Sequence, residues 1–192
     1  MPASPVTTLP AGLRALLDTP TSPGLGSEAR PGTKPVSTLT LEVPQALKQS
    51  GLPSAPHELV CGAVLLWHDH LDESHTIAQG IHNPDGSFLH AIMHRREPDF
   101  ANSKYWWHRV GSHPCFPRLA TRVGAFLDSR QPGLKSELLP GGQWDPFAFV
   151  DACERASRPG GTPERRQLLG ELQQIEFEVL LEHLCGIQAL EG

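Results

Sequence analysis

The placement of the prolines constrains the fold of this chain more than any other feature. Ten of the 19 prolines fall within the first 56 of 192 residues, interleaved with Ser, Thr and Gly. Each proline removes a backbone donor and restricts the residue before it, so this region cannot sustain long helices. We expect residues 1–55 to form an extended Pro/Ser/Thr-rich arm, with short helical turns at 11–17 and 44–49.

Beyond residue 56, proline and glycine fall at the ends of apolar helical stripes. Asp145-Pro146 and Thr162-Pro163 each combine a capping residue with proline at the first helical position. The pattern predicts about six helices, at 56–79, 87–97, 99–110, 117–129, 145–157 and 162–184. The fold class is therefore mainly α, with a single helical domain at 56–192. A small β-hairpin near 76–94 is the alternative, because a Pro-Asp-Gly turn precedes residue 87.

Charge and hydropathy exclude several classes of protein. A net charge of -5 gives no global attraction to nucleic acid or to anionic lipid. The longest nearly uncharged apolar run, 59–67, is far shorter than the ~20 residues that a membrane helix needs, and no signal-peptide pattern opens the chain. We expect a cytoplasmic protein without a membrane partner. The cysteines form no CxxC pair and are expected to be reduced core thiols: Cys61, Cys115, Cys153 and Cys185.

Eight of the ten histidines lie between residues 68 and 113. In the helix predicted at 56–79, His68, Asp72 and His75 stand at positions i, i+4 and i+7, which share one face. The next predicted helix repeats this spacing with a second set, His90, His94 and Glu97.

Two such faces, joined by a short turn, would together offer four imidazoles and two carboxylates. This ligand set suits zinc, iron or manganese. Two alternatives remain open, namely a metal-free polar pocket and a purely structural network. No glycine-rich phosphate loop is present, so no nucleotide cofactor is indicated.

A basic and aromatic cluster overlaps the second histidine face. Paired arginines beside aromatic rings suit a carboxylate or phosphate ligand, and we therefore interpret Arg95 and Arg96 as candidate substrate-binding residues, together with Lys104, Tyr105 and His108. In the alternative interpretation, the arginines neutralise Glu97, Asp99 and the acids of the first predicted helix, and the rings fill the core. The whole cluster comprises Arg95, Arg96, Lys104, Tyr105, Trp106, Trp107, His108 and Arg109.

Three blocks carry a resemblance to a known family. They are His-Ala-Ile-Met-His-Arg-Arg-Glu-Pro-Asp-Phe at 90–100, which continues as Asn-Ser-Lys-Tyr-Trp at 102–106, Trp-His-Asp-His-Leu-Asp-Glu-Ser-His at 67–75, and Val-Gly-Ser-His-Pro at 110–114. In these blocks the chain resembles a family of uncharacterised proteins of bacteria and fungi. The resemblance covers residues 60–116. It implies where the site lies and assigns no activity.

The hypothesis that combines these observations is a metal-dependent enzyme, a hydrolase or an oxidase, that acts on a small anionic molecule. One rival is a metal-free binding module for a phosphate-bearing ligand or an RNA end. Another is a homodimeric structural protein, in which surplus apolar positions of the last helix contact a second subunit: Leu169, Phe177 and Leu180.

Overall fold

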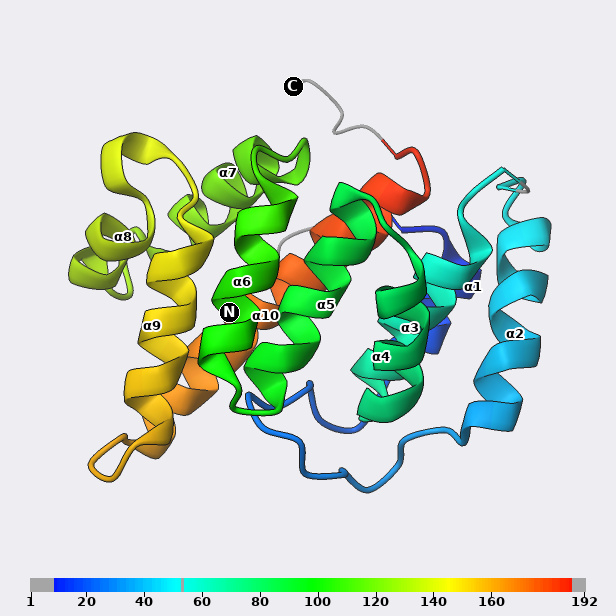
Figure 1. The fold of residues 1–192 in the computed structure, drawn as a ribbon, viewed down its shortest axis with the longest axis horizontal. Helices are drawn as coiled ribbons and strands as arrows, with labels where there is room; N and C mark the ends of the chain where they lie inside the picture. Colours follow the sequence, from blue (N-terminus) through cyan, green and yellow to red (C-terminus); the bar gives the residue numbers. More distant parts are fainter. Residues whose placement is uncertain (1–8, 53, 188–192) are drawn as a thin grey trace.

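The computed structural model describes residues 9–52 and 54–187, and within these residues the chain forms α-helices and no strand (Figure 1). The fold is mainly α, as predicted. The helices are α1 (Ala11–Leu16), α2 (Val36–Gln49), α3 (His57–Trp67), α4 (Leu71–Gly80), α5 (Pro84–Arg96), α6 (Phe100–Val110), α7 (Cys115–Leu127), α8 (Pro132–Leu138), α9 (Pro146–Ser157) and α10 (Pro163–Leu184), with a 3-10 turn η1 (Pro140–Gly142) between α8 and α9.

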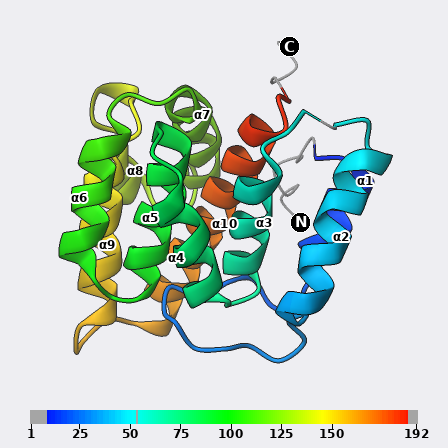
Figure 2. The same ribbon diagram turned by 45° about the vertical axis from the view of Figure 1, so that its right-hand side comes forward.

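Helix α10 forms the centre of the bundle. It passes behind α5 and α6 (Figure 1) and packs against α3, α7 and α9. Leu172, Phe177 and Leu180 on different sides of α10 are fully buried, which fits a helix surrounded by others. In front of it, α4, α5 and α6 stand side by side (Figure 2), so the predicted histidine helices are neighbours in space.

The helix predicted at 56–79 is two helices. α3 ends at Trp67 and α4 begins at Leu71, because Asp69 between them adopts a left-handed backbone with φ of 67°. Arg30 Nε and Arg96 Nη2 bind the carboxylate of Asp69 at 2.8 and 2.7 Å and hold this break. The change of direction ends the common face that His68 and His75 were predicted to share.

Three further predictions of secondary structure need correction. α2 is a 14-residue helix with Pro44 inside, whereas only a turn at 44–49 was expected. Its buried stripe of Leu39, Val43 and Leu47 offsets the cost of the proline, which is ~3 kcal/mol in a helix interior. α8 was not predicted, and the hairpin alternative fails because residues 87–94 belong to α5. Residues 1–8 and 53 of the predicted arm lie outside the described residues.

The segment 17–35, between α1 and α2, runs across the lower ends of α3, α4 and α5 (Figures 1 and 2). The carbonyl oxygen of Gly26 accepts a hydrogen bond from Arg96 Nη2 at 3.0 Å, and that of Gly24 accepts one from Gln173 at 2.8 Å. The ring of His70 lies 2.7 Å from the carbonyl oxygen of Lys34. The predicted arm therefore covers polar groups of the helical domain.

The cysteines are free, as the sequence predicts. Burial raises the pKa of the Cys115 and Cys153 thiols to about 12, so neither is a reactive thiolate near neutral pH. None of the helices in the described part of the chain has the length and apolar character needed to cross a membrane.

Candidate metal centre

Three imidazoles meet in the groove between α4 and α5. His75 comes from α4, and His90 and His94 come from one face of α5, where the i, i+4 spacing stacks their rings at 4.7 Å between centroids. The His75 ring lies edge-on to both, at 4.7 and 5.2 Å. One ring nitrogen from each residue lies within 4.8 Å of the others. The sequence analysis named all three as candidate ligands.

His90 is the innermost of the three, with 2% of its surface exposed. The indole of Trp106 covers one face of the ring at 3.8 Å between centroids. Neither ring nitrogen has a hydrogen-bond partner within the described residues, although a buried polar group without a partner costs ~1–3 kcal/mol. Burial, aided by the neighbouring His94 and His75, lowers the pKa of His90 to about 3. The ring is therefore neutral, the state in which imidazole binds a metal.

A carboxylate orients the ring of His94. Glu97 Oε2 lies 3.0 Å from Nδ1, and Nδ1 therefore carries the proton that it donates to Glu97. Burial lowers the pKa of His94, although Glu97 opposes this shift. Nε2 then holds the lone pair, and a carboxylate on the opposite nitrogen is the usual partner of a metal-bound histidine. Glu97, predicted as a ligand, contacts the centre through His94.

The amide of Asn102 does not block the lone pair of His94. Its nitrogen lies 3.1 Å from Nε2 and 3.4 Å from Nδ1 of the same ring. An atom nearly equidistant from both nitrogens at such distances lies over the face of the ring, because in the ring plane it would clash with the carbon between them. Nε2 therefore stays free in the ring plane, where a metal ion binds.

The donor set fits a divalent transition metal. Imidazole nitrogens suit zinc, copper, iron and nickel, and three histidines with one position left for water form a known catalytic zinc site. Zinc–nitrogen bonds of ~2.0–2.1 Å place ligand atoms ~3.3 Å apart in a tetrahedron. The ring nitrogens here lie within 4.8 Å of one another and the rings of His90 and His94 are stacked at 17°, so at least one of these two rings must turn before both lone pairs reach one ion. His75, His90 and His94 are thus the residues that could hold an ion.

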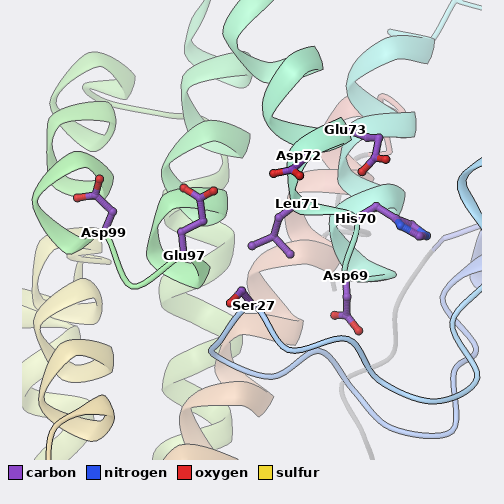
Figure 3. Close-up of a pocket in the computed structure, with 8 residues that line it drawn as sticks. All are labelled: Ser27, Asp69, His70, Leu71, Asp72, Glu73, Glu97 and Asp99. Carbon is purple, nitrogen blue, oxygen red and sulfur yellow. The ribbon is translucent and has the colours of Figure 1, made fainter.

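A pocket of about 550 Å³ has Glu97, the partner of His94, in its lining, whereas the three imidazoles themselves do not line it (Figure 3). Glu97 and Asp99 form one wall, and the first turn of α4 forms the other, with Asp72 one helical turn before His75. Carboxylates dominate the lining, and among residues 9–52 and 54–187 no lysine or arginine side chain belongs to it. The lining residues are Ser27, Asp69, His70, Leu71, Asp72, Glu73, Glu97 and Asp99.

Two residues of the first predicted face lie apart from the imidazole centre. The His68 ring is buried under the predicted arm, where Nδ1 accepts the backbone N–H of Lys34 at 3.0 Å and Nε2 donates to the Leu16 carbonyl oxygen at 2.7 Å. Both ring nitrogens are occupied, so His68 has no lone pair for an ion. Asp72 is exposed on the pocket wall. The helix break at Asp69 separates His68 from His75, whereas Asp72 stays on α4 with His75.

Arg95 and Arg96 are buried in ion pairs. Arg95 binds Glu176 of α10 through both guanidinium nitrogens, and both side chains are 0% exposed. Arg96 binds Asp69 and the carbonyl oxygens of Gly26 and Leu66. Burial pushes the pKa of Asp69 upward, but the bonds from Arg30 and Arg96 outweigh it and leave this pKa below its ordinary value. Both arginines therefore neutralise internal acids. The partner of Arg96, Asp69, belongs to the first predicted helix, as the alternative interpretation held, whereas Glu176, the partner of Arg95, is not one of the acids it named. Neither arginine lines the pocket of Figure 3.

The remaining candidates lie on α6. Lys104 pairs with Asp151 of α9, and His108 contacts the ring of Phe147 at 4.6 Å between centroids. Tyr105 is 53% exposed. None of the three lines the pocket of Figure 3. From the aromatic cluster it is Trp106, through its stacking on His90, that belongs to the centre.

A second histidine–carboxylate cluster was missed by the sequence analysis. Oδ1 of Asp85 lies 3.0 Å from Nε2 of His113 and 2.9 Å from Nε2 of His183. Nδ1 of His113 accepts the backbone N–H of Cys115 at 3.2 Å, so Nε2 must carry the proton and has no lone pair for a metal. The cluster thus joins α5, the segment between α6 and α7, and α10 through hydrogen bonds. Because 98 residues separate Asp85 from His183, no local spacing could reveal it.

Comparisons with known proteins add no assignment. No family model matches the chain, and neither a curated protein nor a solved structure does so. The resemblance in residues 60–116 stays a prediction.

Proposed function

We propose that the protein is a metal-dependent enzyme whose ion is held by His75, His90 and His94. The observation that carries the proposal is the buried, neutral ring of His90, which has no hydrogen-bond partner within the described residues and contacts two other imidazoles. A bound ion would satisfy this ring and would repay the cost of burying it. Glu97 would orient His94, and Trp106 would hold the plane of His90.

The chemistry that suits this centre is activation of water or of a substrate oxygen. A divalent ion lowers the pKa of bound water towards neutrality and polarises a carbonyl or phosphoryl group. Hydrolysis is the reaction that three histidines and an open position support best, with zinc as the first candidate ion. Iron or manganese in the same ligand set would favour oxidative chemistry instead.

The charge around the centre favours a neutral or cationic substrate over the anionic one expected from the sequence. The lining of the neighbouring pocket includes Asp72, Glu73 and Asp99 without a compensating lysine or arginine. The cations proposed to hold an anion, Arg95 and Arg96, are committed to internal carboxylates. The rival of a phosphate-binding or RNA-binding module loses the same two residues, and no specific observation favours it. A homodimer stays a prediction, but Leu169, Phe177 and Leu180, which were expected to contact a second subunit, are buried in the core of the chain itself.

Metal content tests the proposal directly. The untagged protein is analysed by plasma mass spectrometry beside His90→Ala/His94→Ala and beside the matched control His57→Ala/His82→Ala, which removes two exposed histidines outside the centre. We expect near-stoichiometric zinc, iron or manganese in the parent and in the control, and its loss in the first double variant.

Because substitution of the two buried histidines could disturb the fold, a third variant replaces only the half-exposed ligand, His75→Ala, and this variant should also lose the ion. The variant His113→Ala/His183→Ala removes two histidines of the second cluster and should keep the ion. The proposal is wrong if the parent contains no metal, or if a folded His90→Ala/His94→Ala protein keeps its full content.

A further inference from the structure

A second and larger pocket lies away from the metal centre, along one side of α7. It has a volume of about 970 Å³, within the ~300–1,000 Å³ typical of small-molecule sites. α8, η1 and the residues that follow η1 form its opposite side. The lining comprises Ser112, His113, Phe116, Pro117, Ala120, Thr121, Gly124, Ala125, Asp128, Lys135, Ser136, Leu139, Gly142, Gln143 and Trp144.

The walls of this pocket suit a flat, mainly apolar molecule. Three aromatic rings contribute to them: His113, Phe116 and Trp144. His113 takes no part in further polar chemistry, since Asp85 and the Cys115 N–H occupy both of its nitrogens. Aromatic walls favour planar ligands because offset stacking adds ~0.5–1.5 kcal/mol to the burial of area.

One polar group in the wall lacks a partner. Trp144 is 4% exposed, and its Nε1–H meets no acceptor within residues 9–52 and 54–187. Buried indole N–H groups usually donate a hydrogen bond, and one without an acceptor in the protein can be satisfied by an acceptor atom of a ligand. Apart from His113, the other polar side chains of the lining are exposed or half-buried, and two of them, Lys135 and Asp128, form an ion pair. They are Ser112, Thr121, Asp128, Lys135, Ser136 and Gln143.

We propose that the pocket along α7 binds a planar apolar small molecule that carries a hydrogen-bond acceptor, with Trp144 Nε1 as the donor to it. Because Nε1 is buried in this structure, the indole must turn for this donor to reach the ligand. The site is independent of the metal centre, since His75, His90 and His94 take no part in the lining.

The test uses the fluorescent aromatic sulfonate 8-anilinonaphthalene-1-sulfonate as the probe, titrated into the full chain under native conditions. We expect saturable binding of one probe per chain. Ala120→Trp fills the pocket from α7 and should abolish the binding, whereas the matched control Ala101→Trp, at an exposed position of α6, should leave it unchanged. Urea midpoints of the parent and both variants show that the fold persists.

Trp144→Phe keeps an aromatic wall and removes the donor. Loss of one hydrogen bond, worth ~0.5–1.5 kcal/mol, should weaken probe binding about two- to tenfold. Unchanged affinity in this variant overturns the role of Trp144. Absence of saturable binding in the parent, or full binding in folded Ala120→Trp, overturns the pocket itself. His90→Ala/His94→Ala should bind the probe like the parent, which separates this site from the metal centre.

Discussion

Replacing Arg95 by methionine tests whether this arginine holds the fold together or contacts a ligand. Arg95 and Glu176 are both fully buried, and the guanidinium also donates to Gln173 at 3.2 Å and lies 4.5 Å from the centroid of the Phe149 ring. Methionine keeps most of the packing and removes the charge. Breaking a buried ion pair from one side costs ~3–5 kcal/mol, because the other charge is left without compensation.

This magnitude is a large fraction of the ~5–15 kcal/mol that stabilises a typical domain. For a chain of this length it corresponds to a fall in Tm of about 6–20 °C. Urea unfolding followed by far-UV circular dichroism measures the change in free energy. The control Arg109→Met removes an exposed cation 5.4 Å from the Trp106 ring, and it should cost less than ~1 kcal/mol.

The pH dependence of the stability of Arg95→Met shows whether the unpaired carboxylate of Glu176 causes the loss. Burial raises the pKa of Glu176 even with Arg95 beside it. A carboxyl with a raised pKa in the folded state weakens the fold above its ordinary pKa of 4.5 and has no such effect below it. The deficit of Arg95→Met should therefore be largest at pH 7 and shrink towards pH 4. An Arg95→Met protein with parental stability and lost ligand binding or turnover would refute the reasoning.

Three further predictions concern other parts of the chain. Glu97→Gln should weaken metal affinity ~10–100-fold in a chelator competition, because the carboxylate that orients His94 loses its charge; unchanged affinity would contradict this role. Asp85→Asn should cost ~2 kcal/mol at pH 7 in urea unfolding, since two imidazole donors lose a charged acceptor. Those donors lower the pKa of Asp85, so its contribution is present above about pH 4 and disappears as the pH falls further; a deficit independent of pH would argue against it. Gly86→Ala should cost ~1–3 kcal/mol in thermal unfolding, as its Cβ would collide with the carbonyl oxygen of Ile81; a parental Tm would contradict the collision.

Local spacing was enough to predict which histidines meet in the imidazole centre. His90 and His94 share a face because they lie four residues apart on α5, and His75 joins them because α4 and α5 are consecutive. His68 does not join these histidines, for a reason that the spacing of residues along the chain cannot show. A left-handed residue at Asp69 is stabilised by Arg30 and Arg96, from distant parts of the chain, and helical periodicity carries no signal for such a contact.

The same limit applies to charged residues. From the sequence, Arg95 could either bind a substrate or pair with an acid of the protein. The structure shows that it pairs with Glu176. These two residues are 81 positions apart, on helices whose packing only the complete core determines. Proline and glycine, by contrast, end or begin a helix through their own backbone geometry and need no distant partner. Most helix ends after residue 80 therefore lie within a few residues of the predicted ones.

The way the segment 17–35 is anchored has a consequence for synthesis on the ribosome. Its partners are made long after it: Arg96 follows Gly26 by 70 residues, and Gln173 follows Gly24 by 149 residues. At elongation rates of ~5–20 residues per second, Gly24 waits about 7–30 s for the side chain that binds its carbonyl oxygen. During that interval the leucines of α1 and α2 can already pack against each other and against α3, which follows at once in the chain, whereas the segment 17–35 still lacks these two partners. Its hydrogen bond to Gln173 of α10 can therefore form only near the end of synthesis of the described residues.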